Sequence, residues 1–403
     1  MAKEQLFKGY LSSALFLVQN YTGKSPFSIF LKEYFSANKK YGSRDRKYIT
    51  QLCYCFFRSG HALRNVAPEQ KMLDSLFLCS TEQNELLQNL RPELNEKASL
   101  PLKDKIGPLD PAFSIKDIFP WENELSNGID FSSFCISHLI QPFLFLRIRP
   151  GYREAVLAKL HSHQILFEEI GEDCLAFHNT TKLDEILAIN KEVVVQDFNS
   201  QRVGEFFKIV RWAEGQETDS LKRVRRGPSG TVWDCCAASG GKSIMLYDMT
   251  PGIQLTVSDI RENILANLKK RFAAAGIIGY KSFISDLSKN NYQLSSNSYQ
   301  LIIADVPCTG SGTWSRTSEQ LYFFEEKKID EYASLQKNIL KNVVASLLPD
   351  GYLLYITCSV FKKENEDAVK YLEQNFKLQL VKMELLKGYD KKADTLFAAL
   401  LKK

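Results

Sequence analysis

The sequence has little of what builds metal sites, membrane spans or disulfide frameworks. Its nine cysteines include no Cys-x-x-Cys pair and its five histidines are scattered, so we expect neither structural zinc nor any other bound metal. No apolar run is long enough to cross a bilayer, and no basic-then-apolar leader opens the chain, so we expect no membrane attachment. Unpaired thiols without an export signal indicate a cytoplasmic protein.

The net charge and the length of the chain say little about its partners and its number of domains. The net charge of +5 is too small to identify a partner, but basic residues gather at 39–47 and 222–226. Each group is either a solvated face or a contact to phosphate. The 403 residues allow two or three domains, and the 44% hydrophobic content excludes a largely disordered chain.

The first third of the chain is expected to be helical. Residues 1–90 carry leucines and aromatic residues at helical spacing, which indicates a small all-helical domain. Ser43 precedes one apolar helical stretch and is predicted to cap it. Prolines recur throughout residues 91–141, so we expect a connector with short helical pieces.

Residues 142–192 are expected to form a small α+β, RRM-like module. Alternation and turn residues predict strands at 143–150, 165–169 and 174–178, with helices at 153–163 and 183–187. Basic residues lie on the first of these strands, where they either contact RNA or face solvent.

Residues 193–403 are expected to form a Rossmann-like α/β domain. Strands and helices alternate there, which is typical of a doubly wound sheet that binds its ligand at the carboxyl ends of the strands. The last two strands are close in sequence, so one of them should run antiparallel. The expected strands cover residues 231–236, 254–259, 282–286, 299–305, 351–357, 378–385 and 395–401.

The first of these strands leads into a turn of small residues. Its glycines would let a ligand approach the backbone and the helix that follows. A phosphate-binding P-loop needs glycine where Cys236 stands, and no Gly-x-Gly-x-x-Gly occurs, so neither nucleotide motif fits. The predicted cofactor contacts in this turn are Cys236, Ala237, Ala238, Ser239, Gly240, Gly241 and Lys242.

Four strands end in an aspartate, at positions 234, 259, 286 and 305. Asp259 is placed to hold the hydroxyls of a ribose and Asp286 to meet an adenine edge, although such residues also cap helices. Together with a turn that lacks a phosphate grip, they favour an adenosine ligand without phosphates. S-adenosylmethionine fits this description.

Two strands end near a thiol, in Asp305-Val306-Pro307-Cys308 and in Thr357-Cys358-Ser359. Carbon 5 of cytosine becomes nucleophilic when a thiolate adds to carbon 6 and an acid hydrogen-bonds ring nitrogen 3. A base must later remove the carbon 5 proton. Two thiols and Asp305 supply these parts, although unpaired cysteines are more often apolar fillers.

From Val195 onward the chain resembles the Nop/Sun (Fmu) family of RNA cytosine-5 methyltransferases. The resemblance rests on the glycine turn, the strand-end acids, both thiol motifs, Glu364-Asn365-Glu366 and the closing residues 394–400. Residues 43–46 and 52–54 are similar to the NusB-like domain of the bacterial ribosomal RNA enzymes. The resemblance implies RNA as the substrate, with ribosomal RNA favoured. We expect the protein to act as a monomer.

The resemblance also implies roles for single residues. Cys358 is the nucleophile, Cys308 assists release of the product, and Asp305 is the acid at ring nitrogen 3. Lys242 contacts the cofactor or the catalytic pocket unless it only caps its helix, and Arg316 holds an RNA phosphate unless it only forms a surface ion pair. Cys235 and Cys236 are expected to pack beside the turn without taking part in the chemistry.

The chain departs from the family in two places. Ser239 stands where the family usually has proline, and residues 315–319 differ from its Arg-Arg-Asn-Pro-Asp segment. The exact RNA therefore stays open between ribosomal and transfer RNA. Two further alternatives are a DNA methyltransferase, which would use the Pro-Cys thiol as nucleophile, and an idle RNA-binding factor of ribosome assembly.

Overall fold

The computed structural model describes residues 2–107, 109, 113–212, 230–289 and 298–403. The chain divides into two compact units. The first unit consists of residues 1–123, 129–141 and 313–326, and the second of residues 124–128, 142–312 and 327–403. The basic group at 222–226 lies outside the described residues.

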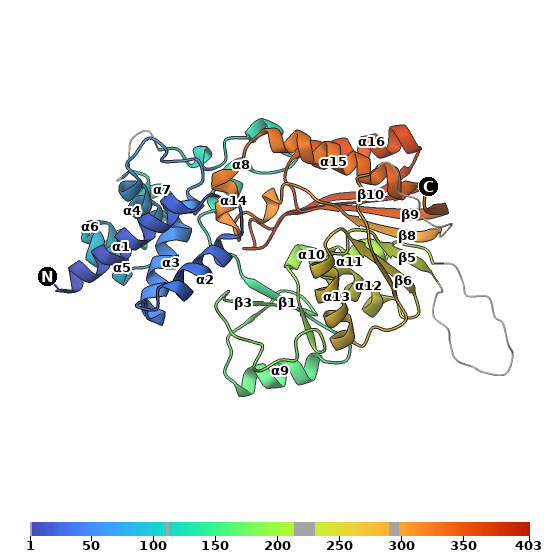
Figure 1. The fold of residues 1–403 in the computed structure, drawn as a ribbon, viewed down its shortest axis with the longest axis horizontal. Coiled ribbons are helices and arrows are strands. Elements are labelled where there is room, and N and C mark those ends of the chain that lie inside the picture. Colours follow the sequence, from blue (N-terminus) through green and yellow to red (C-terminus); the bar gives the residue numbers. More distant parts are fainter. Residues whose placement is uncertain (1, 108, 110–112, 213–229, 290–297) are drawn as a thin grey trace. The chain divides into compact units, whose positions relative to one another are not determined.

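The first unit is helical, as expected (Figure 1). Phe27, Leu52, Phe57 and Leu76 are buried in its interior. A short helix from much later in the chain, α14, packs against the third helix, where Phe57 meets Tyr322 edge to face. The helices of this unit are α1 (Ala2–Asn20), α2 (Phe27–Ala37), α3 (Ser43–Arg58), α4 (Pro68–Cys79), α5 (Glu85–Leu90), α6 (Pro92–Asn95), α7 (Leu102–Lys105), α8 (Phe131–Ser137) and α14 (Ser318–Phe323).

The predicted cap of α3 is wrong by one residue. Ser43 is the first residue of the helix, and Gly42 occupies the cap position. The carboxylate of Asp45 accepts a hydrogen bond of 2.8 Å from the backbone N–H of Gly42. Asp45 thus accepts from the N–H of the cap residue itself, whereas a capping serine would have accepted from N–H groups inside the first turn.

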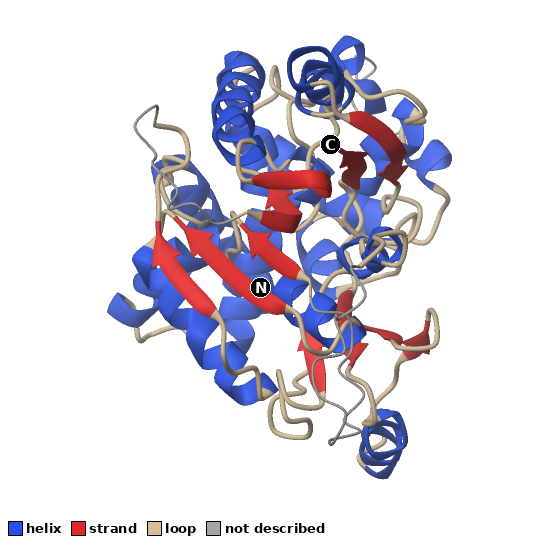
Figure 2. Cartoon of the chain, turned by 90° about the vertical axis from the view of Figure 1, so that its right-hand side faces the viewer, coloured by secondary structure: helices blue, strands red, loops and turns tan. Residues whose placement is uncertain are grey.

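A seven-stranded sheet forms the centre of the second unit (Figure 2). The strand order is β10-β11-β9-β8-β5-β6-β7, and β11 runs antiparallel to both of its neighbours. The expected single reversal is confirmed. The strands are β5 (Thr231–Asp234), β6 (Gln254–Asp259), β7 (Lys281–Ile284), β8 (Tyr299–Asp305), β9 (Leu347–Thr357), β10 (Gln379–Leu386) and β11 (Leu396–Lys402).

Helices cover both faces of this sheet. One face is packed by Phe206, Ile244 and Leu268, and the other by Leu340 and Val369. Burial on both faces explains why the central strands are continuous apolar runs rather than alternating ones. The helices are α10 (Phe198–Arg202), α11 (Gly204–Phe207), α12 (Gly241–Met249) and α13 (Glu262–Ala275) on the first face, and α15 (Lys327–Val344) and α16 (Glu366–Phe376) on the second.

The same unit contains a smaller antiparallel sheet in the order β2-β3-β1-β4. Its elements are β1 (Leu144–Ile148), α9 (Arg153–Ser162), β2 (Glu168–Glu169), β3 (Cys174–Phe177) and β4 (Val193–Val195). The helix expected at 183–187 is absent, because the segment forms a single turn in which the N–H of Leu187 donates to the carbonyl of Leu183 at 2.8 Å. Both leucines are buried in the core of this module, so their spacing reflected burial rather than a helix.

Neither expectation for the basic residues of β1 is correct. The face of β1 that carries Phe145 packs against Ala393 and Phe198 of the larger domain. Arg147, on the same face, is 7% exposed and forms an ion pair of 2.9 Å with Asp248 of α12. The sheet face that could have held RNA or met solvent is therefore an internal contact of the unit.

Two negative findings apply to the described residues alone. None of their helices combines the length and the apolar character that a membrane span requires. They also contain no group of three or more His, Cys, Asp or Glu side chains that could hold a metal ion.

Candidate active site

Two thiols meet at the carboxyl ends of neighbouring parallel strands. β8 and β9 pair in parallel with Asp305 opposite Ile356, so the segments that follow them emerge side by side. Cys308 and Cys358 are both free and half-buried, and their sulfur atoms lie 3.3 Å apart. The structure thus brings together the two cysteines that the sequence singled out.

A buried carboxylate joins the two thiol-bearing segments. Glu364 is fully buried and accepts hydrogen bonds from the N–H and hydroxyl of Thr309, at 2.9 and 2.6 Å. It also accepts from the hydroxyl of Ser359 and, at 3.0 Å, from the amide of Gln336. Because Thr309 follows Cys308 and Ser359 follows Cys358, Glu364 fixes the separation of the thiols.

Asp305 is held by a lysine from the helix that follows the glycine turn. The ammonium of Lys242 lies 2.6 Å from Oδ2 of Asp305, and the two side chains are 13% and 29% exposed. A charge-assisted contact of this length orients both groups. Lys242 therefore reaches the catalytic candidates rather than capping its own helix.

Cys308 and Lys242 both have shifted pKa values. The pKa of Cys308 is raised well above its ordinary value by the hydrogen bond to Cys358 and by burial, so Cys308 keeps its proton. Burial alone would lower the pKa of Lys242, but Asp305 and the thiolate form of Cys358 raise it overall. Lys242 therefore keeps its positive charge beside Asp305.

The glycine turn fits the approach of a ligand. Gly240 has φ of +80°, and a Cβ there would lie 2.6 Å from the ring of Phe272, so this position requires glycine. A Cβ at Gly241 would meet nothing within 4 Å. The open space above Gly241 lies at the amino end of α12, where backbone N–H groups have no helical partner.

The acids at the ends of β5 and β6 are tied to this turn. Asp234 is 1% exposed and accepts from Ser243 at 2.6 Å through Oδ2, while Oδ1 has no partner within the described chain. Burial raises the pKa of Asp234 to about 7. Asp259 accepts from the backbone N–H of Ala238 at 3.0 Å and from the side chain of Arg261 at 2.9 Å, so ribose hydroxyls would have to displace Arg261.

Three other predicted site residues, Asp286, Cys236 and Arg316, make contacts that do not by themselves indicate a ligand. Asp286 follows β7 and accepts from Ser288 at 2.6 Å, as a turn-capping residue does. Cys236 is half-buried beside Cys235, which packs in the core. Arg316 belongs to the helical unit, whereas both thiols belong to the other unit, and its backbone N–H donates to Thr313.

The sequence did not assign a role to three residues that organise this region. Glu364 belongs to the Glu364-Asn365-Glu366 motif, which predicts no function for it. Its position shortly after Cys358 is the one sequence feature that could have identified it. Nothing in the sequence distinguishes Gln336 of α15 or Arg271 of α13 from ordinary helix residues. Each is identified only by its contacts.

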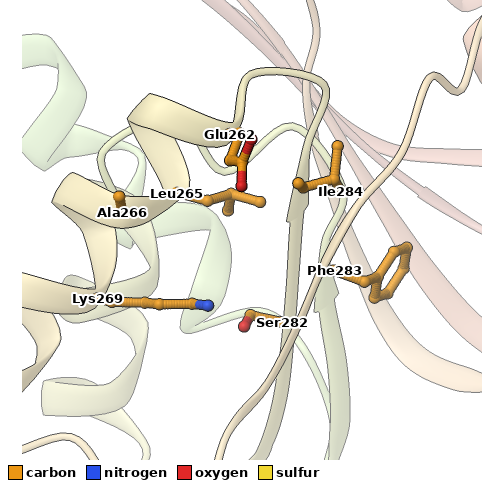
Figure 3. Close-up of a pocket in the computed structure, with 7 residues that line it drawn as sticks. All are labelled: Glu262, Leu265, Ala266, Lys269, Ser282, Phe283 and Ile284. Carbon is orange, nitrogen blue, oxygen red and sulfur yellow. The ribbon is translucent and has the colours of Figure 1, made fainter.

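A separate hollow of about 290 Å³ lies between α13 and β7 (Figure 3). It contains none of the predicted site residues. Its lining consists of Glu262, Leu265, Ala266, Lys269, Ser282, Phe283 and Ile284.

Comparison with known proteins finds relatives of part of the chain. Residues 225–398 match the family model described as 16S rRNA methyltransferase RsmB/F. A ribosomal RNA small subunit methyltransferase B from Shewanella oneidensis is 31% identical over 142 residues, which is 34% of this chain and 32% of that protein. One from Xanthomonas campestris is 25% identical over 202 residues, 50% and 45% of the two chains. The chain thus spans less than half the length of these relatives.

Solved structures share the fold. The crystal structure of PH0851 covers 99% of both chains with a TM-score of 0.68 and 18% identity. A methyltransferase homologue from Pyrococcus horikoshii covers 70% of this chain and 92% of its own, with a TM-score of 0.53 and 18% identity. At this identity the likeness concerns the fold alone.

Proposed function

We propose that the protein methylates carbon 5 of cytosine in RNA, using S-adenosylmethionine, because residues 225–398 match the family model described as 16S rRNA methyltransferase RsmB/F. Ribosomal RNA is the favoured substrate, since the curated relatives are named for it. The observation that carries the proposal is the 3.3 Å approach of Cys308 to Cys358 beside the Lys242–Asp305 pair. These are the groups that cytosine activation needs.

In the proposed reaction, the thiolate of Cys358 adds to ring carbon 6. Cys308 supports that thiolate by donating its S–H, and Lys242 supplies a nearby positive charge. Asp305 passes a proton from Lys242, whose Nζ lies 2.6 Å from its carboxylate, to ring nitrogen 3. The proton offsets the negative charge that develops on the ring and returns when the adduct eliminates. The resulting enamine makes carbon 5 nucleophilic.

Bound S-adenosylmethionine supplies the methyl group as an electrophile. The proton on carbon 5 then passes to Cys308 as the bond between carbon 6 and Cys358 breaks. The hydrogen bond to Cys358 is the largest cause of the raised pKa of Cys308. That bond ends once Cys358 is joined to carbon, so Cys308, which is partly exposed, can give its proton to solvent. The resulting thiolate then accepts the proton from carbon 5.

The residues present fit the cofactor. The open space at Gly241 admits a ligand against the amino end of α12, and the turn carries no phosphate-binding pattern. Asp259 would bind the ribose and Asp286 would meet the adenine edge. The unpartnered Oδ1 of the buried Asp234 lies at the end of β5, where the turn begins.

The proposal extends to the other parts of the chain. Residues 1–90 would form a NusB-like RNA-binding domain, 91–141 a connector, 142–192 an RRM-like module and 193–403 the methyltransferase domain. The strand order β2-β3-β1-β4 supports an RRM-like module, but its sheet face is covered, so RNA would have to contact another surface. Arg316 is proposed to hold an RNA phosphate. The enzyme would act as a monomer in the cytoplasm, where its thiols stay reduced.

The test offers ribosomal RNA, transfer RNA and DNA to the full chain with S-adenosylmethionine and maps 5-methylcytosine by bisulfite sequencing. We expect methylation of RNA, loss of turnover in Cys358→Ala, and a protein–RNA adduct that survives denaturing gels in Cys308→Ala. Cys79→Ala, a thiol of the helical unit, is the matched control. Cofactor binding without methylation of any RNA would indicate the idle ribosome-assembly factor, and an adduct in Cys358→Ala alone would reverse the two roles.

A further inference from the structure

The glycine turn rests on one face of α13. Leu268 and Phe272 of α13 press against Gly240, where a Cβ would come within 3.0 and 2.6 Å of them. Arg271, on the same helical face, donates to Ser239 twice: its Nη1 lies 2.8 Å from the carbonyl oxygen and 2.6 Å from the hydroxyl oxygen. Ser239 is the position at which the chain departs from the proline of the family it resembles.

The same guanidinium reaches the small antiparallel module. Nε of Arg271 donates to the side-chain oxygen of Asn190 at 2.8 Å. Asn190 has φ of +69°, a left-handed conformation that asparagine tolerates better than most residues. Its N–H donates to the carbonyl of Val193, the first residue of β4. One arginine thus joins the glycine turn to the turn that precedes β4.

A second arginine closes the connection from the other side. Arg149, just after β1, donates to the carbonyl of Asn190 at 3.1 Å and forms an ion pair of 2.7 Å with Asp248. Asp248 lies in the last turn of α12, the helix that begins at the glycine turn. The contacts run in a ring from Ser239 through Arg271, Asn190, Arg149 and Asp248 back along α12. Figure 1 shows the module (green) beside α12 and α13 (olive).

This ring of contacts links the small antiparallel sheet to the glycine turn. A proline would restrict the turn by its own ring, whereas serine leaves the backbone freer. The guanidinium of Arg271 binds both the carbonyl and the hydroxyl of Ser239, so it restricts the same backbone from outside. Since Asn190 orients that guanidinium, the module determines how firmly the turn is held.

We propose that Arg271 is a positioning residue that couples the small α+β module, through Asn190, to the cofactor-binding turn at Ser239. This inference rests on the proposed function, because it takes S-adenosylmethionine as the ligand of the turn. Arg271 acts through the turn and makes no contact with the reacting atoms. The module then contributes to cofactor affinity by holding the turn in its binding conformation.

The test measures the Kd of S-adenosylmethionine for the full chain by isothermal titration calorimetry. Arg271→Met should weaken binding about tenfold, since it removes charge-assisted hydrogen bonds to the turn. The matched control is Lys270→Met, which changes an exposed lysine next to it. Wild-type protein that binds no S-adenosylmethionine would contradict the proposed function, whereas unchanged affinity in Arg271→Met would contradict only the coupling.

A double-mutant cycle separates positioning from general stability. Asn190→Ala should weaken cofactor binding, and adding it to Arg271→Met should cause little further loss, because both changes break the same connection. In a Ser239→Pro background, Arg271→Met should have a smaller effect than in the wild type. Independent, additive losses, or an equal effect in both backgrounds, would overturn the proposal. If Arg271→Met does not fold, Arg271→Lys replaces it, since lysine keeps the charge but cannot bridge both partners.

Discussion

Replacing Glu364 with glutamine tests whether one buried carboxylate sets the spacing of the two thiols. The carboxylate accepts four hydrogen bonds, from the N–H and hydroxyl of Thr309, the hydroxyl of Ser359 and the amide of Gln336. Hydrogen bonds to a charged group contribute about 1.5–3 kcal/mol, against about 0.5–1.5 for neutral ones. Glutamine keeps only one acceptor oxygen, so two of the four bonds lose their acceptor, which should cost about 3–6 kcal/mol where the two thiol-bearing segments meet.

We expect Glu364→Gln to slow methyl transfer about a hundredfold, corresponding to roughly 3 kcal/mol, and to leave the Kd of S-adenosylmethionine unchanged. Single-turnover assays measure the rate, and calorimetry measures the affinity. The rate at which an oxidant joins Cys308 to Cys358 reports the spacing and should also fall. Glu373→Gln, an exposed change on α16, is the control. If Glu364→Gln matched this control in rate and in thiol cross-linking, Glu364 would not position the thiols.

Four further substitutions test the glycine turn, the buried acid and the small antiparallel module. Gly240→Ala should lower the melting temperature, because its Cβ would meet Phe272 at 2.6 Å and the φ of this residue is +80°. Gly241→Ala should keep the melting temperature but weaken cofactor binding, because its Cβ fills the open space. Equal melting temperatures for the two variants would contradict this. Burial raises the folded-state pKa of Asp234 from 3.8 to about 7, so the wild type should lose stability as pH rises from about 4 to 7, and Asp234→Asn should flatten that profile of melting temperature against pH. Asp248→Ala leaves Arg147 and Arg149 buried without their carboxylate. It should lower the free energy of unfolding, measured by chemical denaturation, by about 3–5 kcal/mol. Unchanged stability would show that the module is held by its apolar contacts alone.

The order of the helices and strands and the reactive residues at the strand ends can both be predicted from the sequence. The apolar runs that become β8 and β9 are long and end abruptly, so both their location and the meeting of Cys308 with Cys358 follow from parallel pairing. The short segment at 183–187 was misjudged, because leucines four residues apart are equally suited to one helical turn and to a buried loop.

Long-range contacts explain what the sequence did not reveal. Arg147 and Arg149 have the alternation of an exposed strand, and only the fold shows that Asp248, far along the chain, neutralises them. Arg271 likewise gains its partners from two distant turns. A buried ion pair leaves no local pattern, since its two halves are separated by whole elements.

The central claim is that Cys358 forms the covalent bond to cytosine and Cys308 removes the proton that releases it. Its most direct test is peptide mass spectrometry of the adduct formed by Cys308→Ala with substrate RNA in the presence of S-adenosylmethionine. The account predicts a methylated cytidine attached to the peptide that contains Cys358. Attachment to any other residue, or an RNA methylated at full rate with no adduct, would contradict it.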